Sequence, residues 1–126
     1  MYLVFSDRTD LFDRTFRLVA DIPGDVAECG VKRGRSLAYL AYLCQESGRH
    51  IWGFDAWDEA MPYSKNDTDR VVGTRSMEIA DPIIKAKMAN RGVRDDVYTL
   101  VPGWFADTLP GFTTRLNYIH LDADIY

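Results

Sequence analysis

The 126-residue sequence has only two cysteines, Cys29 and Cys44, and only two histidines, His50 and His120. Two cysteines cannot build a disulfide framework, and both stand in apolar stretches, where a free thiol behaves as a small hydrophobic group. No apolar run approaches the roughly 20 residues that are needed to span a bilayer. The first residues lack the basic start and the cleavage site of a signal peptide. These absences predict a cytoplasmic protein that does not bind a membrane.

Positive charge is also scarce. Lysine and arginine together number 15 against 19 aspartates and glutamates, which gives a net charge of −4. Non-specific nucleic-acid binding depends on neutralising phosphates, so the sequence predicts no nucleic-acid partner. Hydrophobic residues make up 47% and charged residues 27%, as is typical of folded globular proteins. The length predicts one domain over residues 1–126.

Segments of helical and extended character alternate along this sequence. Apolar runs predict strands at 26–29, 50–55, 97–101 and 116–121. Apolar spacing and capping residues predict helices over 9–20, from Ser36 to Gly48 and from Asp81 to Asn90. We place the start of the first helix at Thr9 or Asp10, and we expect Ser36 to cap the second. The alternation predicts an α/β fold with a parallel sheet and loops gathered at one edge.

Two further features of this pattern concern the edge of the sheet at which the loops gather. Residues 56–80 are polar and weakly periodic, which predicts a long loop of the kind that often forms a functional lid. The strand at 26–29 ends in Glu28-Cys29 and leads through Gly30 and Gly34 into a helix. This geometry suits a nucleoside cofactor at a helix N-terminus. The spacing G-x-x-x-G argues against the G-x-G-x-x-G fingerprint of dinucleotide binding, and a tight turn without a ligand is an equal alternative.

Asp55 ends the second predicted strand. In nucleoside-binding α/β folds an acid at this place accepts hydrogen bonds from the ribose hydroxyls. Trp57 follows two residues later and is placed to cover an adenine ring. The alternative for Asp55 is a helix cap or a solvated turn.

Two more groups follow later strands. Trp104 and Phe105 come directly after the third strand, and core packing explains the pair better than ligand binding does when spacing alone is considered. Alternation in the fourth strand places His120, Asp122 and Asp124 on one face. Converging carboxylates bind Mg²⁺ or act as a general base, and a solvated strand end is the alternative. An iron site would need a second histidine at this edge, and His50 begins a strand at the other edge.

Four segments, in this order, resemble the macrocin-type O-methyltransferases, a class I family that uses S-adenosylmethionine. They are Pro23–Gly34, Trp52–Trp57, Gly103–Pro110 and Leu121–Tyr126. The resemblance covers about residues 22–126. It implies a Rossmann-like fold, a parallel sheet with helices on both faces, and methylation of a sugar hydroxyl of a natural product or glycan with the help of Mg²⁺.

The resemblance also implies roles for individual residues. Asp122 would bind Mg²⁺ and would help to deprotonate the acceptor hydroxyl. The ribose and adenine would lie against Asp55, Ala56 and Trp57, and the cofactor pocket would be lined by Trp104 and Phe105. The methionine part of the cofactor would be surrounded by Glu28, Gly30, Arg33, Gly34 and Ser36.

The sequence departs from the family pattern in three places. Arg35 stands where the family has a second glycine, and residues 56–62 are one residue longer, so either Asp58 or Glu59 takes the acidic position there. The sequence stops after the fourth strand, whereas the family continues with a fifth strand and further metal-binding acids. We therefore expect a cofactor-binding half with sheet order 3-2-1-4 and an open edge at strand 4. The alternatives are a non-catalytic interaction module that assembles through this edge, as a homo-oligomer or with a missing C-terminal half, and an NAD-dependent half-domain.

Overall fold

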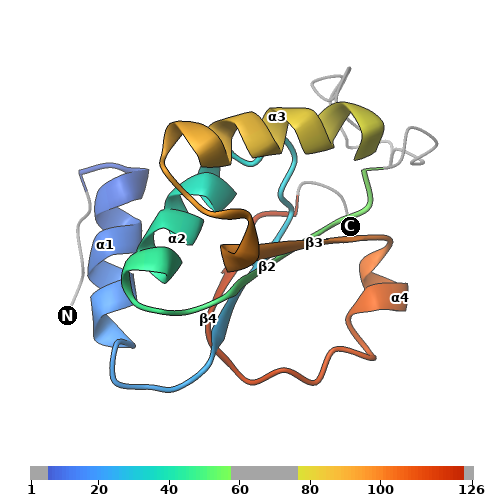
Figure 1. Cartoon of the computed structure of the whole chain (residues 1–126). Coiled ribbons are helices and arrows are strands. Elements are labelled where there is room, and N and C mark those ends of the chain that lie inside the picture. Colours follow the sequence, from blue (N-terminus) through green and yellow to red (C-terminus); the bar gives the residue numbers. More distant parts are fainter. Residues whose placement is uncertain (1–5, 58–76, 124–126) are drawn as a thin grey trace.

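Four parallel strands form the sheet at the centre of the structure (Figure 1). The computed structural model describes residues 6–57 and 77–123. The sheet order is β3-β2-β1-β4, which confirms the predicted order and leaves β4 at an edge within these residues. The strands are β1 (Asp25–Cys29), β2 (Ile51–Asp55), β3 (Tyr98–Pro102) and β4 (Leu116–Leu121).

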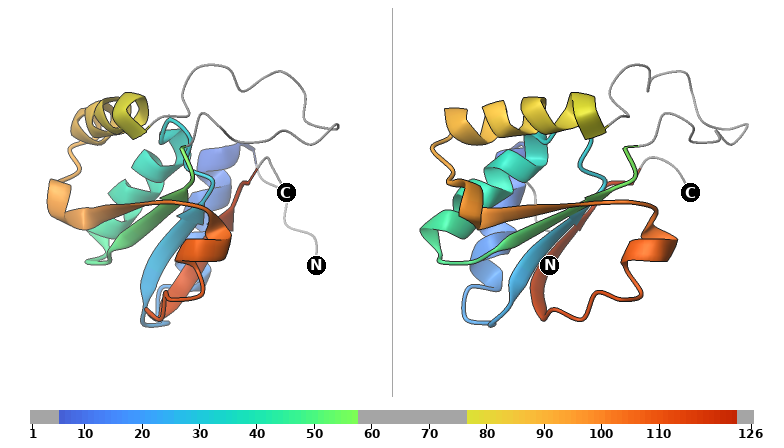
Figure 2. Two further views of the ribbon diagram at one scale, coloured as in Figure 1. Left: turned by 90° about the vertical axis from the view of Figure 1, so that its right-hand side faces the viewer. Right: turned by 45° about the vertical axis from the view of Figure 1, so that its right-hand side comes forward.

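Helices lie on both faces of this sheet, as the resemblance implied, but the two faces are covered unequally (Figure 2). One face carries α1 (Arg8–Leu18), α2 (Arg35–Glu46) and α3 (Met77–Asn90). The other face carries the single-turn α4 (Phe105–Thr108). A short 3₁₀ helix, η1 (Asp95–Val97), leads into β3. Within the described residues no helix is both long enough and apolar enough to cross a membrane.

The larger hydrophobic core lies between the sheet and the three long helices. Each helix contributes a fully buried side chain to this core, namely Phe12, Leu37 and Ile84. Strand residues that point toward the helices, such as Val26 and Ile51, complete it. Both cysteine thiols are free and buried, as the sequence indicated.

The opposite face of the sheet has a smaller core. Phe54 packs edge-on against Phe112 with ring centroids 5.0 Å apart, and Phe105 of α4 packs against the same cluster. Farther along this face, on the edge strand β4, Ile119 is 54% exposed and Leu121 is 74% exposed. Among the described residues, the smaller core therefore leaves the apolar side chains at this end of β4 uncovered.

The capping predictions for the first two helices are wrong by two or three residues. Asp7 caps α1, because its carboxylate accepts from the backbone N–H of Asp10 at 2.8 Å. Gly34 is the N-cap of α2, with φ +80°, a left-handed conformation that glycine adopts without steric cost. Ser36 lies inside the helix, where its hydroxyl has another partner.

The third helix begins earlier than its local signals predict. It starts at Met77, and Pro82 lies inside it rather than at its first position. Asp81 does not cap the helix but pairs with Lys85 one turn later at 2.8 Å. Burial of Ala80 in the core favours the extra turn. Tertiary packing therefore overrides a local start signal, while the predicted end at Asn90 is confirmed. The rest of the predicted lid, residues 58–76, lies outside the described residues, as do Asp58 and Glu59.

Candidate functional site

Backbone hydrogen bonds tie the ends of all four strands together at one edge of the sheet. Gly30 donates to the carbonyl of Phe54 at 2.8 Å, and Asp122 donates to the carbonyl of Cys29 at 2.9 Å. Gly103 donates to the carbonyl of Asp55 at 3.0 Å. The loops that the sequence singled out are therefore neighbours in space, as the parallel topology requires.

Gly30 lies against the end of β4. It has φ +95°, and a Cβ atom at this position would lie 2.6 Å from the carbonyl carbon of Asp122 and closer still to its oxygen. No side chain fits there without moving the backbone. Close approach of two strand ends, rather than approach to a ligand, thus accounts for the glycine.

Gly34 ends the loop and begins α2. Its N–H donates to Val31 at 2.9 Å, which closes the turn, and a Cβ atom would lie 2.9 Å from Cγ1 of Ile84 in α3. Because the N-cap residue is glycine, it has no side chain with which to cap the first amides of α2. Such amides have no partner within the helix and favour negative charge or acceptor atoms.

Asp55 joins the first loop to the second. One carboxylate oxygen accepts from the backbone N–H of Lys32 at 2.8 Å, and the other accepts from the N–H of Trp57 at 3.1 Å. A carboxylate offers about four lone-pair positions, so Asp55 keeps acceptor capacity for hydroxyl groups of a ligand. The alternative of a solvated turn acid is too simple, because Asp55 holds two loops in place.

The ring of Trp57 is not open to the surface. Trp57 is 4% exposed and belongs to the larger core, and its indole N–H donates to the carbonyl of Lys32 at 2.9 Å. Both residues have positive φ angles, +45° for Trp57 and +54° for Lys32. This backbone turns the indole inward, so only a small part of the ring is left exposed beside the expected adenine position. Ala56, between Asp55 and Trp57, is half-buried.

Glu28 is a charged residue buried at this edge. It is 1% exposed, and its Oε2 lies 2.8 Å from Nδ1 of His120. Its Oε1 is buried and has no hydrogen-bond partner among the described residues. Burial raises the pKa of Glu28 above its usual value, and the hydrogen bond from His120 opposes this. A buried oxygen without a partner costs about 1–3 kcal/mol, which a ligand that donates a hydrogen bond would recover.

Arginine side chains add positive charge around the loop. Arg8 of α1 donates from Nη1 to the hydroxyl of Ser36 at 3.0 Å, and its charge lowers the pKa of Glu28 as a minor effect. Arg33 is exposed, and after burial its charge and that of Arg35 help to lower the pKa of Lys87. Arg8 and His120 were not selected as site residues from the sequence. Arg8 stands 28 positions before Ser36 and gives no local signal, whereas strand alternation had placed His120 on the face of Asp122.

The aromatic pair after β3 is divided between two environments. Phe105 packs in the smaller core with Phe54 and Phe112, as the packing alternative predicted. Trp104 is 39% exposed. The pair follows Gly103, whose N–H bonds to Asp55, so the aromatic residues begin beside the candidate site.

The described residues do not complete a metal site. They contain no group of three or more His, Cys, Asp or Glu side chains placed to hold a metal ion. Asp122 is half-buried at the end of β4, and Asp124 lies outside the described residues. His50 bonds to Thr99 at the opposite end of the strands, at 2.8 Å, which confirms that it stands apart from Asp122.

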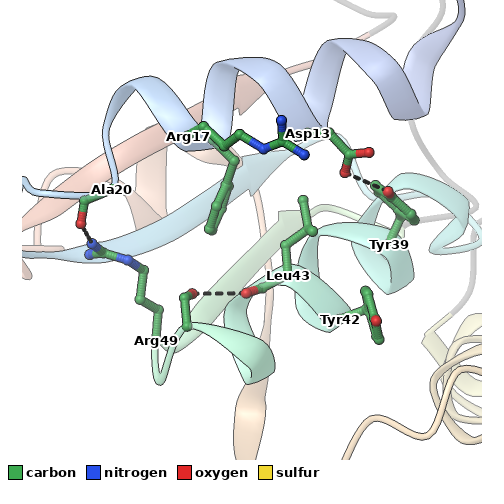
Figure 3. Close-up of a pocket in the computed structure, with 9 residues that line it drawn as sticks. Asp13, Arg17, Ala20, Tyr39, Tyr42, Leu43 and Arg49 are labelled. Atoms are coloured by element: carbon green, nitrogen blue, oxygen red, sulfur yellow. Dashed lines mark hydrogen bonds between the residues drawn. The ribbon is translucent and has the colours of Figure 1, made fainter.

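A separate cavity of about 370 Å³ lies between α1 and α2 (Figure 3). None of the residues predicted for the site lines it. Its polar groups bond to one another: Tyr39 donates to Asp13 at 2.6 Å, and Arg49 donates to the carbonyl of Ala20 at 2.8 Å. The cavity therefore offers less unsatisfied polar chemistry than the strand ends.

The donor and acceptor set at the strand ends fits an S-adenosylmethionine molecule. The buried oxygen of Glu28 that lacks a partner suits an ammonium group, the start of α2 with glycine as its N-cap suits a carboxylate, and Asp55 suits ribose hydroxyls. The set does not fit Mg²⁺ on its own, because Asp122 is a single carboxylate without two further ligands among the residues of 6–57 and 77–123.

Comparisons with known proteins find similar O-methyltransferases. The chain is 36% identical over 122 residues to an 8-demethyl-8-(2,3-dimethoxy-alpha-L-rhamnosyl)-tetracenomycin-C 4'-O-methyltransferase of Streptomyces olivaceus, covering 86% of this chain and 46% of that protein. It is 26% identical over 118 residues to a mycinamicin III 3''-O-methyltransferase of Micromonospora griseorubida, covering 83% and 46%. The chain thus spans about half the length of these relatives.

A solved structure and a family model extend the comparison. The crystal structure of CalS11, a calicheamicin methyltransferase, superposes with a TM-score of 0.67 at 26% identity, over 94% of this chain and 54% of that one. The macrocin O-methyltransferase (TylF) family model matches residues 6–126. The chain therefore belongs to the macrocin O-methyltransferase family.

Proposed function

We propose that residues 1–126 form the S-adenosylmethionine-binding part of an O-methyltransferase that acts on a sugar hydroxyl of a natural product. The observation that carries the proposal is that two acids lie at the ends of neighbouring strands: Glu28, which is buried and has one oxygen without a partner, and Asp55, which accepts from the loop between Gly30 and Gly34. Family membership supports the reaction type, and the named rhamnosyl and mycinamicin substrates of two relatives support the acceptor class.

In this proposal the loop and two acids hold the cofactor. Oε1 of Glu28 accepts a hydrogen bond from the ammonium group of the methionine part, and Asp55 accepts from the ribose hydroxyls. The backbone at Gly30, Arg33, Gly34 and Ser36 surrounds the methionine part. Trp104 and Phe105 border the pocket, and the backbone of Ala56 and Trp57 lies beside the adenine because the indole ring itself is buried.

The cofactor supplies the methyl group when it is bound, and the protein has to hold the acceptor oxygen in line with it. Asp122 stands at the end of the strand beside Glu28 and is the candidate to accept the proton of the acceptor hydroxyl. We propose Asp122 as one ligand of Mg²⁺ as well. The remaining ligands of that ion would have to come from outside the described residues.

Calorimetric titration of the 126-residue chain with S-adenosylhomocysteine, with and without Mg²⁺, tests this proposal. We expect one binding site and a loss of affinity of about 10- to 100-fold in Asp55→Ala, since hydrogen bonds to a charged group contribute about 1.5–3 kcal/mol. Asp96→Ala is the matched control, because Asp96 is an exposed acid that bonds to Arg94 on the surface. A folded chain that does not bind the ligand contradicts the proposal.

A further inference from the structure

His120 faces Glu28 across two neighbouring strands. The parallel pairing of β1 with β4 sets these two residues opposite each other, one position before Cys29 and Leu121. The imidazole Nδ1 lies 2.8 Å from Oε2 of Glu28, and the carboxylate is 1% exposed. An ionised carboxylate only accepts hydrogen bonds, so Nδ1 carries the proton whenever Glu28 is ionised.

Packing fixes the ring of His120 in this position. Phe12 of α1 meets the imidazole edge-on, with ring centroids 5.0 Å apart and an angle of 83° between the planes. Just beyond it, the N–H of Asp122 bonds to the carbonyl of Cys29 and holds the end of β4 to β1. The imidazole is therefore held by the fixed end of β4 and by its contact with Phe12. Rotation of the ring would break both the hydrogen bond to Glu28 and this aromatic contact.

The bond leaves the two oxygens of Glu28 in different states. Oε2 is occupied by His120, whereas Oε1 is buried without a hydrogen-bond partner among the described residues. A carboxylate that is held by one oxygen cannot turn about its final bond without losing that partner. Its second oxygen, which is buried and has no partner among the described residues, is then held in one direction as well.

We infer that His120 is a positioning residue of the cofactor site, which orients Glu28 so that Oε1 meets the ammonium group of the methionine part. This inference rests on the proposed function. His120 does not touch the cofactor in this arrangement and acts through Glu28 alone. Its effect should therefore appear only with ligands that carry the amino-acid part.

Two substitutions separate the hydrogen bond from the packing. His120→Phe keeps a planar ring against Phe12 and removes the donor, whereas His120→Asn keeps an N–H donor at the place of Nδ1 and removes the ring. Each variant is titrated with S-adenosylhomocysteine and with 5'-methylthioadenosine, which has the adenine, ribose and sulfur but no amino-acid part. Circular dichroism of each variant verifies that it is folded.

The inference predicts that His120→Phe weakens S-adenosylhomocysteine binding by about tenfold or more, the usual effect of losing a hydrogen bond to a charged group. The same variant should bind methylthioadenosine as the unaltered chain does, and His120→Asn should restore most of the S-adenosylhomocysteine affinity. In a Glu28→Gln background, His120→Phe should have little further effect, because coupled residues are not additive.

The failures of the two proposals are distinguishable. If the unaltered chain binds neither ligand, the proposed function is wrong and this inference falls with it. If the unaltered chain binds S-adenosylhomocysteine but His120→Phe weakens both ligands equally, or weakens neither, the positioning role of His120 is wrong and the proposed function stands. Failure of His120→Phe to fold, with His120→Asn folded but as weak as Glu28→Gln toward S-adenosylhomocysteine, also overturns the positioning role.

Discussion

Replacement of Gly30 by alanine tests the account of the loop after β1. Gly30 has φ +95°, and an added Cβ atom would lie 2.6 Å from the carbonyl carbon of Asp122. The obstacle is backbone rather than a flexible side chain. The end of β4 would have to move away from β1, and this would stretch the hydrogen bond from Asp122 to Cys29, now 2.9 Å long.

The expected loss in the free energy of unfolding is the sum of three separate effects. A positive φ angle costs an alanine about 1–2 kcal/mol, overpacking against neighbouring atoms costs about 1–3 kcal/mol, and a weakened hydrogen bond costs about 0.5–1.5 kcal/mol. We therefore expect Gly30→Ala to lower the free energy of unfolding by about 3 to 6 kcal/mol. Gly48→Ala is the matched control, because Gly48 also has a positive φ, +68°, but no atom lies within 4 Å of an added Cβ.

Urea unfolding, followed by tryptophan fluorescence, measures both variants. Gly48→Ala should lose only the backbone contribution, about 1–2 kcal/mol, with the dependence on urea unchanged. The steric account of Gly30 is refuted if the two variants lose the same stability within about 0.5 kcal/mol, a difference typical of surface substitutions. Such a result would restore close approach of a ligand as the reason for the glycine.

Three other predictions concern Asp55 and the two buried cysteines. Asp55→Asn leaves one carbonyl oxygen where two carboxylate oxygens now accept from the N–H groups of Lys32 and Trp57, so urea unfolding should show a loss of about 1–3 kcal/mol; no loss would mean that Asp55 does not hold the loops. Burial raises the pKa of Cys44 to about 12 and also raises that of Cys29, so the native protein should show no rapidly reacting thiol toward a disulfide reagent at pH 8, and two after unfolding. A native thiol that reacts at once at pH 8 would contradict the burial of the cysteines. Because the pKa of the thiol is near 9 in the unfolded chain and about 12 in buried Cys44, the free energy of unfolding should fall as the pH rises from 9 to 12.

The sheet was predictable from the sequence for a physical reason. Each strand is a short apolar run between turn residues, and alternation with helices permits few topologies. The strands and their order were predicted correctly, as was the gathering of the loops at one edge. Errors arose where several local signals compete. Asp7, Thr9 and Asp10 all carry side chains that can cap a helix, and only the three-dimensional backbone selects Asp7.

The site was less predictable, because its details depend on contacts between distant residues. Glu28 and His120 are 92 positions apart, and only the pairing register brings them together. Trp57 was expected to cover an adenine ring, but positive φ angles at Lys32 and Trp57, for which neither residue type gives a signal, turn its ring into the core. In the same way Asp81-Pro82 looks like a helix start, and burial of Ala80 extends the helix past it.

Hydrogen exchange at backbone amides, measured with and without S-adenosylhomocysteine, tests the central claim most directly. The account places the ligand at the strand ends, so added ligand should slow exchange at residues 30–36 and 55–57. The amides of Gly48 and Gly92, at the ends of helices away from that edge, should exchange at unchanged rates. Slowing confined to the residues of α1 and α2 that line the cavity in Figure 3, or no slowing at saturating ligand, would contradict the claim.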